Sequence, residues 1–164
     1  MKARTRPKVA AIVGWKNSGK TTLVSRLVRE LTERGRQVAT VKHGHHAAAM
    51  DVAGSDTHRH REAGACSTML VTDNGWSLNV ARETLTLDGA LARCPEADIV
   101  LVEGFKNAPA AKIECRRAEA DGPPLWPQDR WVVAVAHDGS ATSDRPQFEL
   151  DDITGLADFI EALP

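Results

Sequence analysis

Residues 14–21 read Gly-Trp-Lys-Asn-Ser-Gly-Lys-Thr, which satisfies the pattern Gly-x-x-x-x-Gly-Lys-Ser/Thr of a phosphate-binding loop. The preceding residues, Lys8 to Val13, form a short apolar run that is typical of a strand buried on both faces. The following residues place Leu23, Leu27 and Leu31 on one face of a predicted amphipathic helix. This strand, loop and helix context is what the pattern requires, so a chance match in a glycine turn is the weaker interpretation.

Each residue type in this loop has a chemical reason. Gly14 and Gly19 allow the backbone to turn and to approach a phosphate closely. Successive backbone N–H groups and the positive end of the helix that begins near Lys20 bind anionic oxygens. The Lys20 ammonium can bridge the β- and γ-phosphates, and the Thr21 hydroxyl can bind Mg²⁺. We therefore predict a nucleoside triphosphate site formed by Gly14, Asn17, Ser18, Gly19, Lys20, Thr21 and Thr22.

The rest of the chain alternates between strand-like and helix-like segments. The further predicted strands are residues 37–42, 67–72, 76–80, 98–102, 112–116 and 131–136. The further predicted helices are residues 57–63, 85–93 and 153–163, the last capped by Asp151 or Asp152. Asn74-Gly75 between two strand-like runs indicates a β-hairpin. These patterns predict an α/β fold of the P-loop NTPase type, with a mostly parallel sheet flanked by helices and an embedded antiparallel hairpin.

The composition is that of a globular protein with no strong charge bias. The 164 residues carry a formal net charge of −1 and are 42% apolar, which argues against a nucleic-acid partner and against a disordered chain. No apolar run reaches the ~18 residues that a membrane span needs. The three cysteines are odd in number and far apart, as expected of reduced thiols in the cytoplasm. We expect one domain over residues 1–164, with residues 1–7 forming a flexible basic tail.

Besides the hydroxyl of the loop, an acidic side chain is needed to hold Mg²⁺. The predicted strand 98–102 ends in Glu103, which places this carboxylate at the edge of the sheet where ligands bind. Asp98 lies at the opposite end of the same strand and is the poorer candidate. Glu103 is therefore the predicted metal ligand, the alternative being a solvated loop glutamate.

The polar segment after the second strand is dense in charge and imidazole. Asp56 could complete the Mg²⁺ shell through water, and Arg59 and Arg61 could pair with phosphates, so these three are the candidates for a catalytic role. The sequence contains no clear glutamine to orient water and no other obvious arginine finger. The cluster of five histidines here could bind a metal, but loop histidines without companion cysteines are the simpler interpretation: His43, His45, His46, His58 and His60.

The prediction that the bound nucleotide carries guanine rests on Asp138, which follows the predicted strand 131–136. A carboxylate in this position can accept hydrogen bonds from both N1–H and the exocyclic amine of guanine, and adenine offers no such pair of donors. The full Asn-Lys-x-Asp motif is absent, and Asp138 could instead cap the turn before Gly139.

Four motifs in order resemble the molybdopterin-guanine dinucleotide biosynthesis protein B (MobB) family. They are Gly14 to Leu23 (GWKNSGKTTL), Val41 to His46 (VKHGHH), Gly54 to Ala65 (GSDTHRHREAGA) and Leu101 to Lys106 (LVEGFK). The resemblance implies a GTP-binding accessory protein that works beside the nucleotidyltransferase attaching GMP to molybdopterin. It also implies weak GTP hydrolysis at most, contact with molybdopterin or its guanine dinucleotide, and a homodimer joined through the hairpin region, residues 67–80. By motif, the loop would hold the phosphates, and Asp56 and Glu103 would serve the metal.

Two other functions remain open. A small-molecule kinase could use the same loop, although the Pro-rich stretch 121–127 is short and poor in arginine for a phosphate-covering lid. A GTP-dependent metallochaperone would give the histidine cluster a purpose. Calorimetric comparison of GTP with ATP would separate the guanine reader from the kinase.

Overall fold

The computed structural model describes residues 6–44, 51–80, 83–94, 96–119, 122–139 and 142–164. Internal contacts divide the chain into two compact units, one made of Met1–His43 with Leu87–Pro164 and one made of Gly44–Thr86. The predicted tail falls mostly outside the described residues, as do His45 and His46. The single domain over 1–164 stays a prediction, and the two units are described separately below.

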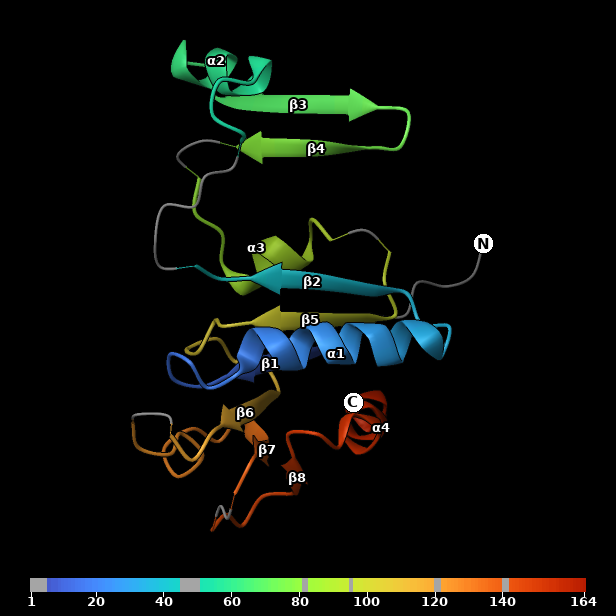
Figure 1. The fold of residues 1–164 in the computed structure, drawn as a ribbon, viewed down its shortest axis with the longest axis vertical. Helices are drawn as coiled ribbons and strands as arrows, with labels where there is room; N and C mark the ends of the chain where they lie inside the picture. Colours follow the sequence, from blue (N-terminus) through green and yellow to red (C-terminus); the bar gives the residue numbers. More distant parts are fainter. Residues whose placement is uncertain (1–5, 45–50, 81–82, 95, 120–121, 140–141) are drawn as a thin grey trace. The chain divides into compact units, whose positions relative to one another are not determined.

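The first unit is built on a six-stranded sheet (Figure 1). Its strands are β1 (Lys8–Val13), β2 (Val38–Lys42), β5 (Ile99–Glu103), β6 (Lys112–Arg116), β7 (Val132–His137) and β8 (Gln147–Glu149). They lie in the order β2-β5-β1-β6-β7-β8, and every neighbouring pair is parallel. The predicted α/β class with a mostly parallel sheet is confirmed. The sequence did not reveal β8, because three residues reading Gln-Phe-Glu carry no periodic signal.

Helices cover both faces of this sheet. On one face, α1 (Lys20–Glu33) and α4 (Ile153–Ala162) pack with Ile12, and Leu27, Leu31 and Ile160 are fully buried there. On the other face, α3 (Leu87–Leu91) packs through Leu87. This helix is shorter than the predicted residues 85–93. Asp152 caps α4, since its Oδ1 accepts from the Gly155 N–H at 3.0 Å.

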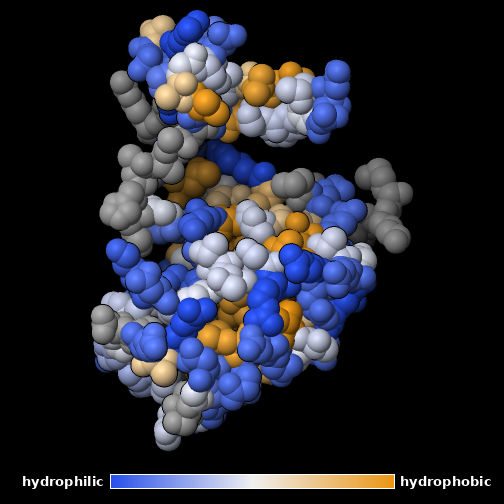
Figure 2. All heavy atoms as spheres, viewed as in Figure 1, coloured by the Kyte–Doolittle hydropathy of each residue, from blue (hydrophilic) through white to orange (hydrophobic). Residues whose placement is uncertain are grey.

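The second unit consists of α2 (Asp56–Glu62) and an antiparallel hairpin of β3 (Ser67–Thr72) and β4 (Gly75–Val80). The predicted Asn-Gly hairpin is therefore confirmed. Directly opposed pairs place four side chains on one face of the hairpin, where all are exposed by 46% or more: Met69, Val71, Trp76 and Leu78. Figure 2 shows apolar side chains gathered on this hairpin. Exposed apolar faces of this kind mark interaction surfaces in soluble proteins.

No helix in the described segments has both the length and the apolar character needed to cross a bilayer. The longest, α1, has 14 residues and a polar face.

A buried carboxylate fixes the segment that follows β6. Glu114 is fully buried, and its Oε2 accepts from the N–H groups of Leu125 at 2.9 Å and Trp126 at 3.1 Å. Its Oε1 accepts from Arg116 Nη1 at 3.1 Å. A buried charge is tolerated only when it is paired and hydrogen-bonded in this way. Glu114 therefore ties residues 122–127 to the sheet.

This anchor gives a stability prediction. Glu114→Ala leaves the two backbone N–H groups and the Arg116 guanidinium without their acceptor, so we expect the free energy of unfolding to fall by about 3–5 kcal/mol. Urea denaturation followed by circular dichroism measures this change. Glu119→Ala, which removes an exposed glutamate five residues later, is the matched control and should change stability by less than about 0.5 kcal/mol. Equal effects of the two substitutions would contradict the anchoring role.

Candidate functional site

The phosphate loop joins the carboxyl end of β1 to the first turn of α1. Three of its residues have positive φ: Gly14 at 148°, Asn17 at 64° and Gly19 at 89°. A Cβ on Gly14 would lie 2.4 Å from the Cys115 carbonyl oxygen and 2.7 Å from Ser18 Oγ. The loop conformation therefore requires glycine at position 14 both for backbone geometry and for space.

Lys20 begins α1 and folds back over this loop. Its Nζ donates to the Trp15 carbonyl oxygen at 2.5 Å and to Ser18 Oγ at 3.4 Å. Burial is the main cause that lowers the pKa of Lys20 below its usual value, and the nearby cations Lys106 and Lys42 act in the same direction. A phosphate in the loop would give this ammonium the counter-charge that the free loop supplies only through carbonyl and hydroxyl oxygens.

Two oxygen ligands meet beside the loop. Thr21 Oγ1 donates to Glu103 Oε1 at 2.9 Å, so the structure brings together the two residues for which the sequence predicts metal binding. Carboxylate and hydroxyl oxygens are the donors that Mg²⁺ prefers, and the pair lies at the carboxyl edge of the sheet, next to the loop. The donor set thus fits Mg²⁺. Its role as a metal site stays a prediction.

Lys42, which the sequence analysis did not single out, stands at the same place. Its Nζ lies 3.0 Å from Glu103 Oε1 and 3.4 Å from Thr21 Oγ1. The register of the sheet explains the contact, because Lys42 and Glu103 are direct partners at the ends of β2 and β5. The lysine ammonium thus neutralises the carboxylate that a metal ion would bind. The strand register between Val41-Lys42 and Val102-Glu103 is the signal that could have revealed it.

Trp15 and Lys106 form a second contact at the loop that sequence reasoning missed. Lys106 Nζ lies 3.8 Å from the centroid of a Trp15 ring, and the indole N–H donates to the Pro123 carbonyl oxygen at 2.8 Å. Cation–π contact and hydrogen bond together hold Trp15 in place. Lys106 therefore adds another positive charge near Lys20, which favours an anionic ligand.

Asp138 follows β7, as predicted, and its carboxylate is engaged. Its Oδ1 accepts from the Ala118 N–H at 2.7 Å, which ties the segment after β7 to the segment after β6. This structural role differs from the cap of the turn before Gly139 that the sequence left open, because the Gly139 N–H donates to His137 Nδ1 at 3.3 Å. Reading of guanine by Asp138 stays a prediction.

Asp56, Arg59 and Arg61 lie on α2, in the other compact unit. Arg59 Nη1 lies 3.8 Å from Asp56 Oδ1, and Arg61 Nε lies 3.6 Å from Asp51 Oδ2. The structure gives these residues partners within their own unit, and their catalytic role toward a nucleotide stays a prediction. Across the segments that the structure describes, no group of three or more His, Cys, Asp or Glu side chains is arranged to hold a metal ion.

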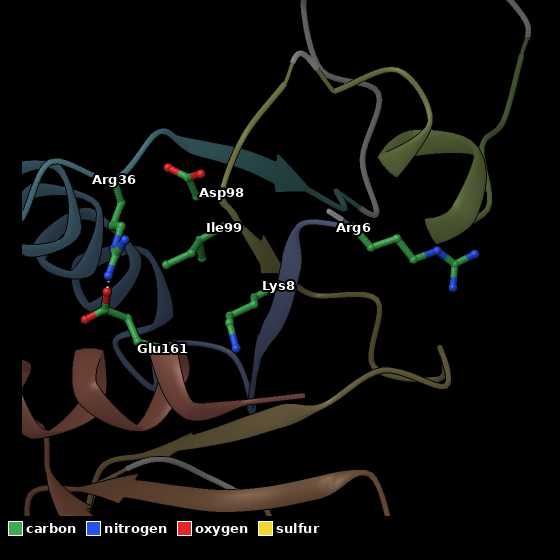
Figure 3. A pocket seen from close by; sticks show the side chains of 6 residues that line it. All are labelled: Arg6, Lys8, Arg36, Asp98, Ile99 and Glu161. Atoms are coloured by element: carbon green, nitrogen blue, oxygen red, sulfur yellow. Dashed lines mark hydrogen bonds and ion pairs between the residues drawn. The ribbon is translucent and has the colours of Figure 1, made fainter. Parts of the chain in front are cut away.

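A separate pocket of about 290 Å³ lies at the amino ends of the strands and is lined by Arg6, Lys8, Arg36, Asp98, Ile99 and Glu161 (Figure 3). Arg36 Nε pairs with Glu161 Oε1 at 2.5 Å, and Lys8 Nζ donates to the Leu163 carbonyl oxygen. Asp98 Oδ2 accepts from the Gln37 N–H at 2.8 Å. With these groups already paired, and with the phosphate loop at the other edge of the sheet, this pocket is not the candidate site.

Comparison with known proteins gives one consistent result. Residues 9–138 match the family model of molybdopterin guanine dinucleotide synthesis protein B (MobB). The chain is 37% identical over 153 residues to a molybdopterin-guanine dinucleotide biosynthesis adapter protein of Haemophilus influenzae, covering 92% of this chain and 85% of that protein. It is 35% identical over 169 residues to the Escherichia coli adapter protein, covering 98% and 95%. The crystal structure of a MobB homologue from Bacillus stearothermophilus superposes with a TM-score of 0.68 at 28% identity, covering 94% of this chain and 98% of that one.

The cysteines provide a test of the packing beneath the loop. Cys115 is fully buried, its Sγ donates to the Ser18 carbonyl oxygen at 2.8 Å, and burial raises its pKa to about 11. At pH 8 only about one thousandth of this thiol is the reactive thiolate. We expect iodoacetamide to modify the exposed Cys66 well before Cys115, as measured by peptide mass spectrometry. Urea-unfolded protein is the control, in which both should react at similar rates. Comparable rates in the folded protein would mean that Cys115 is not sealed beneath the loop.

Proposed function

This chain belongs to the molybdopterin guanine dinucleotide synthesis protein B (MobB) family, and we propose that it is the GTP-binding adapter of molybdopterin-guanine dinucleotide biosynthesis. The adapter role in this pathway follows from membership of the family. The finer proposal is that the protein binds GTP with Mg²⁺ and works beside the nucleotidyltransferase that attaches GMP to molybdopterin. The observation that carries it is the convergence of Lys20, Thr21 and Glu103 on one phosphate loop.

The loop residues would divide the work of binding. Backbone N–H groups of the loop would hold the phosphates, and the Lys20 ammonium would leave the Trp15 carbonyl oxygen to reach the β- and γ-phosphates. Thr21 and Glu103 would hold Mg²⁺, which when bound neutralises phosphate charge. Lys42 would then release Glu103 and become available to the ligand's own negative charge.

We propose slow hydrolysis at most, and the glutamines support this. The chain has only three, Gln37, Gln128 and Gln147, and none belongs to the segments that carry the phosphate loop and Glu103. Gln37 precedes β2 and lies at the amino edge of the parallel sheet. Gln147 pairs with Val135 of β7 and belongs to β8, the edge strand three positions from β1. A residue that orients water for attack on the γ-phosphate would be needed at the carboxyl edge, beside β1 and β5. Slow hydrolysis suits an adapter that uses its nucleotide as a bound ligand and not as a source of free energy.

We propose that the protein is a cytoplasmic homodimer, and the hairpin supports the dimer. Its face of Met69, Val71, Trp76 and Leu78 is exposed. Burying an apolar face against a second copy is a common way to remove it from water. The nucleotidyltransferase, with molybdopterin or its guanine dinucleotide, would then be the partner of this dimer.

Triphosphate binding is tested through Lys20. Lys20→Ala removes the ammonium that would contact the phosphates, so we expect the affinity for GTP with Mg²⁺ to fall by about 100-fold or more in calorimetric titration. Lys16→Ala, an exposed lysine in the same loop, is the matched control and should change affinity by less than about threefold. Thermal unfolding without nucleotide should be similar for both variants. Unchanged GTP affinity in Lys20→Ala would remove the proposal.

Base selection is tested through Asp138. Asp138→Ala should lower the affinity for GTP about 10- to 100-fold and leave ATP nearly unchanged, because only guanine offers two donors to a carboxylate. Asp138→Asn separates recognition from folding, since the amide oxygen can still accept from the Ala118 N–H. We expect this variant to lose GTP but to gain affinity for xanthosine triphosphate, whose 2-oxo group can accept from the amide. Equal losses of affinity for GTP and ATP would show that Asp138 only ties the segment after β7 to the segment after β6.

A further inference from the structure

Arg117 lies against the phosphate loop although no sequence motif points to it. It directly follows β6, which pairs with β1 on the side opposite β5 and Glu103. A Cβ built on Gly19 would lie 3.0 Å from Arg117 Nε and 3.3 Å from both Cζ and Nη2. The guanidinium therefore lies beside the last glycine of the loop, where α1 begins.

This guanidinium has no protein partner in the described parts of the chain. The neighbouring Arg116 is different, because its Nη1 pairs with the buried Glu114 at 3.1 Å. The Arg117 side chain is exposed, and its charge acts on the buried Cys115 thiol, lowering its pKa against the larger effect of burial. Among the described residues no ion pair joins it to Asp138, whose Oδ1 accepts from the Ala118 N–H. Within the described segments, Arg117 is thus a cation without an ion-pair partner beside a loop that favours anions.

We infer that Arg117 is a further nucleotide-binding residue whose guanidinium contacts the α- and β-phosphates held by the loop, an inference that rests on the proposed GTP binding. The position of Arg117 favours contact with the α- and β-phosphates. Glu103 and Thr21 lie on the β5 side, where a metal would serve the β- and γ-phosphates. Arg117 lies on the β6 side, toward Asp138, between the loop and the proposed base site. A planar guanidinium with several N–H donors suits two neighbouring phosphates better than an ammonium does.

The position of Arg117 also restricts which residue can occupy position 19 of the loop. A Cβ at position 19 would require the Arg117 guanidinium to shift by a few tenths of an ångström, in addition to adopting a φ of 89°. Glycine at this position therefore leaves room for the cation as well as for the ligand.

The test is a set of three variants titrated with GTP and with GDP. Arg117→Gln removes the charge, and we expect the affinities for GTP and GDP to fall by the same factor, about 10- to 100-fold. Arg117→Lys keeps the charge without the planar set of donors and should recover part of the loss, whereas a residue that stacks on the base would be replaced better by the planar Gln. Arg130→Gln, an exposed arginine that precedes β7 at the opposite edge, is the matched control and should bind as wild type.

Three results would overturn the inference: wild-type affinity in Arg117→Gln, a loss confined to GTP, or a lysine variant no better than glutamine. A loss confined to GTP would place the guanidinium at the γ-phosphate. These results are distinct from failure of the proposed function. If wild-type protein binds GTP and Lys20→Ala does not, the function stands whatever Arg117 does. If wild-type protein fails to bind GTP, the function and the inference fall together.

Discussion

β1 pairs in parallel with β5 on one side and with β6 on the other, and β2 pairs in parallel with β5. Parallel pairing brings the carboxyl ends of all four strands to one edge of the sheet. The segments that leave those ends carry the phosphate loop, Glu103, Lys42 and Arg117. Each of these groups is far from the others in sequence. Strand order and register bring these groups together at the phosphate loop.

At the same edge, charged side chains of the free protein contact groups that a phosphate and Mg²⁺ could replace. The ammonium of Lys20 contacts loop oxygens, and that of Lys42 contacts Glu103. Both contacts involve groups that would have to separate when phosphate and Mg²⁺ bind. The free protein thus satisfies Lys20, Lys42 and Glu103 internally, which limits the cost of desolvation, while leaving an excess of positive charge for the ligand. The pKa of Lys20 is lowered chiefly by burial, which outweighs the opposing effect of Glu103.

Local sequence patterns were sufficient for the parts of this structure whose cause is local. The loop pattern, the apolar strands around it and the Asn-Gly turn each depend on residues within a few positions of one another. Glu103 was predicted because one strand ends there. Lys42 and Arg117 were not, because their importance comes from partners on other strands. Lys112 and Glu114 look like outward-facing residues of an alternating strand, yet both are buried. Lys112 reaches Asp129 at 2.6 Å, and Glu114 reaches the backbone after residue 122, so partners remote in sequence reverse the expected burial.

The division into two units separates two kinds of surface chemistry. The unit with the parallel sheet carries polar, charged groups arranged around a loop, a surface that is satisfied by water, by internal pairs or by a phosphate. The hairpin unit carries an apolar face that water cannot satisfy and that its single helix, α2, does not cover, since Met69, Val71, Trp76 and Leu78 remain exposed. The proposed nucleotide would therefore change the charge of the first unit without being needed to cover the second unit's apolar surface. The proposed adapter would use the two surfaces differently: the first would bind a small anionic ligand, and the second would bind protein through apolar burial.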